Sequence, residues 1–299
     1  MNNLLGEIAA IGTAICWSFT STFFTIGGRH VGSVVVNRAR LLLAIVFLSF
    51  THMLIHGELF PYHAEPFRWG WLGLSGIIGL ALGDAALFQA FVLVGPQVSM
   101  LLMSLVPIIS ALIAWIFLNE TLSLVRIGAI VLTIVGIIIV VFKKRSSKSI
   151  LNRKFYTAGI LLGIGGAFGQ AIGLIAAKKG LAGNFSGLSA TLMRVLSAAV
   201  ILWIFTLIIR QGKTTVLKLR NKKALAAIAA GAFVGPFLGI WLSMIAIKFT
   251  YVGVASTLMA LPPIFLLPLS YWFFKEKITL QSVFGTLIAV AGTAIIFLT

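Results

Sequence analysis

The feature that most constrains the fold is an almost unbroken series of apolar runs, each long enough to span a membrane as a helix. About 20 apolar residues are needed to cross a hydrocarbon core of ~30 Å. Hydrophobic residues make up 60% of this chain and charged residues only 10%, whereas roughly a quarter of the residues in a soluble domain are charged. The short alternating segments of an outer-membrane barrel are missing. The sequence therefore predicts an all-α polytopic membrane protein.

Ten transmembrane helices are predicted, separated mostly by short loops. We place them near residues 4–27, 31–54, 69–93, 96–118, 122–142, 155–178, 185–209, 225–248, 252–274 and 279–298. The first run lacks the basic leading segment and the small-residue cleavage site of a signal peptide, so we expect it to be a true first helix. No long polar linker divides the chain, which indicates one membrane domain.

The chain also contains an internal repeat. The shift of 156 residues that relates Pro107 to Pro263 also relates Glu120 to Glu276 and Gly83 to Gly239. In the second helices a shift of 154 residues relates Arg40 to Arg194. We therefore expect two copies of one five-helix unit, at 1–142 and 155–299, joined by a basic connecting loop at 143–154.

Because five is odd, the second copy enters the membrane from the opposite side, and the two repeats are expected to be inverted. The loop charges agree: 55–68 has a net charge of −1, whereas its counterpart 210–224 carries six basic residues and no acid. Loop 143–154 is also basic. Under the positive-inside rule, loops 143–154 and 210–224 are cytoplasmic and both termini lie outside.

The repeated block resembles the drug/metabolite transporter (DMT) superfamily, and within it the EamA family. LVPIISALIAWIFLNETL and PPIFLLPLSYWFFKEKITL each place a proline within an apolar run that ends at a glutamate. The arginine in the second helix of each copy and Trp17 in AICWSF fit the same pattern. The resemblance covers nearly the whole chain. It implies a secondary transporter, commonly an exporter of amino acids or other small metabolites. It also implies cytoplasmic termini, whereas the loop charges place both termini outside.

Asp84 is the leading candidate for a substrate or coupling residue, because it lies near the middle of the third predicted helix. A charge there is costly and must face protein or water. It is either a proton- or substrate-coupling carboxylate or a structural partner for an arginine. Arg40 and Arg194 are candidates for pairing with Asp84 or for binding an anionic solute group, since guanidinium matches carboxylate geometry. Arg38 is expected to snorkel to the interface.

Other candidates follow from polarity and backbone chemistry. A cavity is expected to be lined by polar and aromatic side chains at mid-depth, namely Trp17, Ser18, Gln89, Ser104, Gln170 and Trp241. Pro107, Pro262 and Pro263 interrupt backbone hydrogen bonding, so they are candidates for helix kinks that allow gating or that are static. The repeated acids Glu120 and Glu276 are expected to end their helices at the interface in a structural role, with a gate as the alternative.

The function expected is secondary active transport by alternating access, in the direction of export, of amino acids or organic anions across the plasma membrane. A passive facilitator or channel for small solutes is the alternative. Protons are a candidate coupling ion, and monomer and homodimer both remain open. Asp84 is the only aspartate, so the carboxylate pair of an intramembrane aspartyl protease is missing, and no enzyme is expected. No cofactor and no metal is expected. No nucleic-acid partner is expected either, because the basic residues flank apolar runs, as membrane topology requires.

Overall fold

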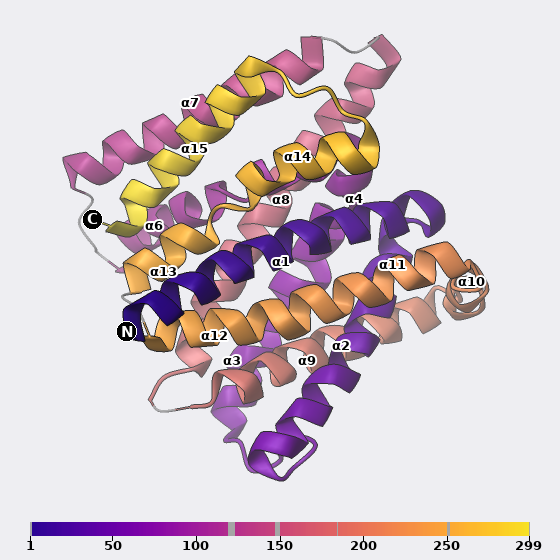
Figure 1. Ribbon diagram of the computed structural model, residues 1–299. Coiled ribbons are helices and arrows are strands. Elements are labelled where there is room, and N and C mark those ends of the chain that lie inside the picture. Colours follow the sequence, from indigo (N-terminus) through magenta and orange to yellow (C-terminus); the bar gives the residue numbers. More distant parts are fainter. Residues whose placement is uncertain (1, 119–122, 147–149, 184, 250–251, 299) are drawn as a thin grey trace.

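The structure is a computed structural model of the 299-residue chain, and it describes residues 2–118, 123–146, 150–183, 185–249 and 252–298 (Figure 1). All regular secondary structure in these ranges is helical. Ten helical segments among the described residues are long and apolar enough to span a membrane. The predicted fold class, an all-α polytopic membrane protein with ten spans, is therefore confirmed.

The first five spans are built from the following helices: α1 (Asn2–Val31), α2 (Ser33–His56), α3 (Pro66–Ser75) continued by η1 (Gly76–Gly83) and α4 (Asp84–Val94), α5 (Pro96–Leu102) followed by α6 (Leu105–Leu118), and α7 (Leu124–Ser146). The last five spans are built in the same order: α8 (Ile150–Gly180), α9 (Gly187–Ile208), α11 (Lys222–Ala232) continued by η2 (Phe233–Gly239) and α12 (Ile240–Phe249), α13 (Val252–Met259) followed by α14 (Pro262–Phe274), and α15 (Leu280–Leu298).

The two halves interlock through their first and third spans. In Figure 1, α1 runs along α11 and α12 of the second half. In the same way, α8 packs against α3, η1 and α4 of the first half. The fifth spans, α7 and α15, lie side by side away from α2 and α9. Each half therefore supplies one long helix to the other, and the buried clusters of the core contain side chains of both halves.

The third spans are not the uninterrupted helices that the sequence predicted, and the fourth spans are interrupted close to the prolines at which kinks were predicted. η1 and η2 are π-helical turns inside the third spans. The fourth spans are broken at residues 103–104 and 260–261, directly before the segments that contain the predicted prolines. Proline removes a backbone donor, so it is tolerated at a helix start but disrupts a helix interior.

The polar segments between spans also differ from the predicted loops. α7 extends to Ser146 and α8 begins at Ile150, so most of the predicted loop 143–154 is helical, and loop 210–224 contains a short helix, α10 (Gly212–Lys218). Backbone hydrogen bonding within a helix does not require an apolar side chain. A helix therefore continues past the hydropathy boundary wherever no residue stops it.

Candidate functional site

A buried ion pair joins the second and third spans. Arg40 on α2 and Asp84 at the start of α4 form a salt bridge between Nη2 and Oδ2. Arg40 is 6% exposed and Asp84 5% exposed, and both lie well inside predicted spans. A lone charge at this depth would be costly, and pairing with a well-oriented opposite charge lowers that cost.

The second half of the chain completes the shell of Asp84. Nε2 of Gln170 on α8 donates to Oδ1 of Asp84 at 2.5 Å, and also to the carbonyl oxygen of Gly79 at 3.3 Å. Both carboxylate oxygens of Asp84 are thus held, one by each half of the chain. Arg40, Asp84 and Gln170 form a polar cluster that crosses the boundary between the repeats.

The π-helical turn η1 supplies the backbone part of this cluster. Arg40 Nη2 donates to the carbonyl oxygen of Leu80 at 3.1 Å, and Nδ2 of Asn37 donates to that of Ala81 at 3.1 Å. The wider π-helical turn thus presents consecutive carbonyls, at residues 79–81, to side chains of α8 and α2. Such turns are rare and frequently lie at functional sites.

Two residues that hold Arg40 were missing from the sequence prediction. Oδ1 of Asn37 accepts from Arg40 Nε at 3.0 Å, and the Arg40 guanidinium carbon lies 4.8 Å from the centroid of the Phe88 ring. Their spacings were available as a signal: Asn37 is three residues before Arg40, and Phe88 is four residues after Asp84. Both spacings place side chains on one helix face.

Arg194 lies beside the polar cluster but is not bonded to it. Its Nε is buried and has no hydrogen-bond partner among the described residues. Its Nη2 would be 3.6 Å from a Cβ placed on Gly79. It interacts electrostatically with Asp84, although the ion pair in contact with that carboxylate is made by Arg40. The structure thus answers which arginine pairs with Asp84.

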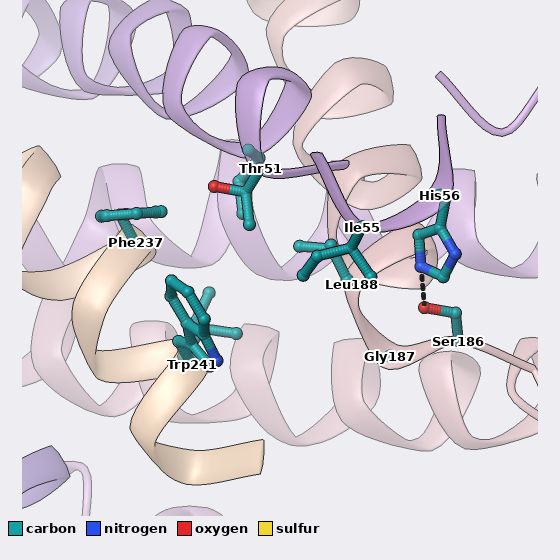
Figure 2. Close-up of a pocket in the computed structure, with 10 residues that line it drawn as sticks. Thr51, Ile55, His56, Ser186, Gly187, Leu188, Phe237 and Trp241 are labelled. Carbon is teal, nitrogen blue, oxygen red and sulfur yellow. Dashed lines mark hydrogen bonds between the residues drawn. The ribbon is translucent and has the colours of Figure 1, made fainter. Parts of the chain in front are cut away.

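The apolar cavity in Figure 2 lies between the two halves, farther along α2 and α9, and has a volume of about 420 Å³. It is lined by the end of α2, the start of α9, and the η2–α12 segment, which contribute Leu48, Thr51, Ile55, His56, Ser186, Gly187, Leu188, Phe237, Ile240 and Trp241. In Figure 2, Phe237 and Trp241 face Thr51 across the cavity. His56 Nε2 lies 3.2 Å from Ser186 Oγ at its other end. Of the predicted cavity residues, the structure places Trp241 here.

The other predicted cavity residues lie elsewhere. Trp17 packs against the end of η2, with Nε1 3.0 Å from a Cβ placed on Gly239. Gln89 accepts a hydrogen bond from Ser33 Oγ at 2.6 Å. Ser18 is buried and bonds the carbonyl oxygen of Ala14, and Ser104 is buried in the break between α5 and α6. None of these four lines the cavity of Figure 2.

The predicted prolines and acids are placed as follows. Pro107 is the third residue of α6, and Pro262 and Pro263 begin α14, so these prolines follow helix breaks rather than kink one continuous helix. Glu276 follows the end of α14, and its Oε1 would be 2.8 Å from a Cβ placed on Gly95. Glu120 lies outside the described residues.

Arg38, which was expected to snorkel to the interface, lies on α2. It is 2% exposed, and its guanidinium reaches the segment 210–224, which the sequence places at the end of the spans. It donates to Thr215 Oγ1 at 2.7 Å and to Gln211 Oε1 at 3.2 Å. The residue is held by the segment around α10, whose position the sequence did not indicate.

The described residues contain no group of three or more His, Cys, Asp and Glu side chains that could hold a metal ion. The polar cluster consists of one carboxylate, one amide and one guanidinium group, with the guanidinium of Arg194 beside it. The cavity is mostly apolar. These groups can bind and orient a solute or exchange a proton.

Comparison with known proteins agrees with this architecture. One solved structure, described only as "Crystal structure of protein", is 15% identical to this chain and has a TM-score of 0.68. The match covers 97% of this chain and 95% of that one, which shows a shared fold. No curated protein matches the chain. The family model described as "EamA-like transporter family" matches twice, over residues 4–142 and 157–298. These two matches, in agreement with two five-helix halves, show that the chain belongs to the EamA-like transporter family, whose members move small solutes across membranes and are not enzymes.

Proposed function

We propose that this protein is a secondary active transporter that exports small metabolites, such as amino acids or organic anions, across the plasma membrane by alternating access. The observation that carries the proposal is the polar cluster of Arg40, Asp84 and Gln170, buried inside the membrane and shared by both halves. Intramembrane ionisable groups are by default functional candidates, because they are costly to keep.

The cluster is placed where relative movement of its helices must disturb it. Arg40, Asp84 and Gln170 lie on three different helices, α2, α4 and α8, so a movement of any of these helices against the others changes the bonds on Asp84. Alternating access in inverted-repeat transporters is largely a rocking movement around a fixed site. Asp84 is therefore our candidate for the group that takes up and releases a coupling proton.

The unequal surroundings of Asp84 and Ile240 support alternating access. These residues occupy equivalent positions in the two repeats. Asp84 is covered by Arg40 and Gln170, whereas Ile240 lines the open cavity. If the halves exchange conformations, the cavity at Ile240 closes and an equivalent opening forms at Asp84. In the described conformation, the ion pair of Arg40 and Asp84 would then be the contact that prevents this second opening, at Asp84, from forming.

The proposed orientation follows from the basic loops. With 143–154 and 210–224 in the cytoplasm, α2 runs outward from Ser33 to His56. The cavity then lies in the outer half of the membrane, and the described conformation is the outward-facing one. The proposed uptake of protons at Asp84 and the proposed plasma-membrane location both fit this orientation.

The test is export of a labelled amino-acid mixture, with a labelled organic acid added, from loaded proteoliposomes. Wild type and Asp84→Asn are compared with and without a pH gradient. We expect gradient-dependent export by wild type and loss of that dependence in the variant. Equal movement by both proteins whatever the gradient would instead indicate a passive facilitator. Absence of movement of every solute by the wild type would contradict the proposed substrate class.

A further inference from the structure

We propose that Arg194 is the anion-binding residue of the transport site and that it takes the carboxylate of an organic acid or amino acid. This inference rests on the proposed transport function and narrows it. It assigns different roles to two arginines that the repeat makes equivalent: Arg40 is bound to the protein, and Arg194 is available to the solute.

Two of the three guanidinium nitrogens of Arg40 are already bonded within the protein, which leaves it little capacity for a second anion. Its Nε is used by Asn37, and its Nη2 by the Leu80 carbonyl and by Asp84. The Phe88 ring packs on its guanidinium face. A solute carboxylate could bind two nitrogens of Arg40 only by displacing Asn37, the Leu80 carbonyl or Asp84. Asp84 is itself held by Gln170.

Arg194 has the opposite character. Its buried Nε has no hydrogen-bond partner in the described part of the chain. The acid that pairs with Arg40 is Asp84, and the equivalent position in the second half is Ile240, so Arg194 has no equivalent acid. A buried polar group without a partner costs free energy, and native structures contain few of them. A ligand that supplies two acceptor oxygens would remove that cost, since the guanidinium fork matches a carboxylate.

The local charge balance favours the same ligand. Two guanidinium groups lie near one carboxylate, and both oxygens of Asp84 are already bonded. The other five acids of the chain, Glu7, Glu58, Glu65, Glu120 and Glu276, lie by sequence at the ends of spans or between them. One positive charge therefore lacks a bonded counterion at this depth, which an anionic solute would provide.

The packing beside the Arg194 guanidinium is looser than at the equivalent place in the second half. A Cβ placed on Gly79 would meet no heavy atom closer than Arg194 Nη2 at 3.6 Å, whereas one placed on the equivalent Gly235 would lie 2.4 Å from Thr20 Oγ1. A methyl-sized group would therefore fit at Gly79 in ordinary van der Waals contact, whereas the equivalent position at Gly235 is occupied by Thr20.

The cavity of Figure 2 lies along the same face of α9. Gly187 lines that cavity, and Arg194 follows it by seven residues, which is two helical turns or about 10 Å. Phe237 and Trp241 at the cavity wall suit an apolar or aromatic body. The solute class inferred is therefore an amphipathic monocarboxylate, including a zwitterionic amino acid that binds through its carboxylate.

Arginine footprinting on the wild-type protein in liposomes tests this inference without a transport assay. Phenylglyoxal reacts with accessible guanidinium groups, and peptide mass spectrometry reports each site. We expect modification of Arg194 but not of Arg40, with exposed Arg220 as the reactive control. Benzoate, phenylacetate or L-phenylalanine should slow modification of Arg194 severalfold, and benzylamine should not. Arg220 should react at the same rate throughout.

A binding measurement with two variants completes the test. For whichever carboxylate protects Arg194, we expect Arg194→Gln to raise the half-saturating concentration about tenfold or more. Arg194→Lys, which keeps the charge but loses the fork, should give a smaller increase. The inference is overturned if Arg194 does not react, or if none of the three carboxylates protects it, even when the same liposomes export solute. If Arg194 is protected but no solute moves, the proposed transport function fails instead.

Discussion

The π-helical turns η1 and η2 occupy equivalent places in the two halves, but they differ in the chemistry around them. η1 ends at Asp84, which is bonded by Arg40 and Gln170. η2 contains Pro236 and ends at Ile240, which lines a cavity. The backbone geometry is thus retained in both repeats, while the charge is present in one. The duplication accounts for the architecture, and the difference between the copies marks the candidate site.

The helices that cross these turns also differ. At the crossing of α8 and η1, two glycines face each other. A Cβ placed on Gly83 would be 3.3 Å from the Cα of Gly169, so the two backbones lie close together. α1 crosses η2 through side chains: Thr13 Oγ1 donates to the Gly239 carbonyl at 3.4 Å, and Thr20 Oγ1 to that of Gly231 at 3.4 Å. Glycine contacts let helices approach closely, which brings Gln170 within reach of Asp84.

Removal of the carboxylate should have the largest effect on stability. Asp84→Ala leaves the Arg40 charge buried without its partner, and we expect a loss of about 3–5 kcal/mol. Ile240→Ala, its counterpart beside a cavity, should cost about 2 kcal/mol or less, the lower end for truncating a buried isoleucine. Thermal unfolding in detergent compares them. Equal losses would mean that the charge is not what distinguishes the two turns. The double variant Asp84→Leu/Arg40→Leu should recover much of the loss.

The next effect concerns the contact between η1 and α9. A Cβ on Gly76 would lie 2.1 Å from the backbone oxygen of Arg194, so Gly76→Ala must separate two backbones and should cost about 3 kcal/mol. The equivalent residue of the second half is Ala232, and Ala232→Gly should cost about 1 kcal/mol. Unfolding midpoints of both variants measure the difference. A harmless Gly76→Ala would contradict the close crossing.

The bond between the halves can be removed separately. Gln170→Leu takes away the amide that donates to Asp84 Oδ1, and a lost hydrogen bond to a charged group should cost about 2 kcal/mol. Gln89→Leu is the matched control, since its amide oxygen accepts from neutral Ser33 and its loss should cost about 1 kcal/mol. If the control is the more harmful variant in an unfolding assay, the polar cluster is not the stronger connection.

The smallest effect on stability is expected at the cavity. Trp241 is 48% exposed, so Trp241→Ala should change stability by about 0.5 kcal/mol or less. It should raise the KM for an apolar solute severalfold, because it removes aromatic contact area from the cavity wall. Trp17→Ala, which alters packing against Gly239 outside that cavity, should show the reverse pattern. KM changes of similar size in both variants would mean that the cavity does not bind the solute.

Much of the candidate site was predictable because a charged side chain within a membrane span must face the protein interior or water. Asp84, Arg40, Gln170 and Arg194 were each singled out by polarity within an apolar run, and the structure brings all four together. Trp17 and Gln89 were selected on the same grounds but pack elsewhere. Polarity at mid-depth indicates that a side chain avoids lipid, but it does not indicate which interior surface the side chain reaches.

The sequence by itself determined the ten spans and the repeat. Hydropathy is a local property of each segment, and the repeat follows from residue identities at a constant shift, so neither needs knowledge of contacts. The tertiary structure decided which arginine pairs with Asp84, where the third spans widen and where the cavity lies. These choices depend on how closely helices cross, as at Gly76 with Arg194 and Gly83 with Gly169. The contacts that set those crossings join residues far apart in the chain, and no local pattern encodes their geometry.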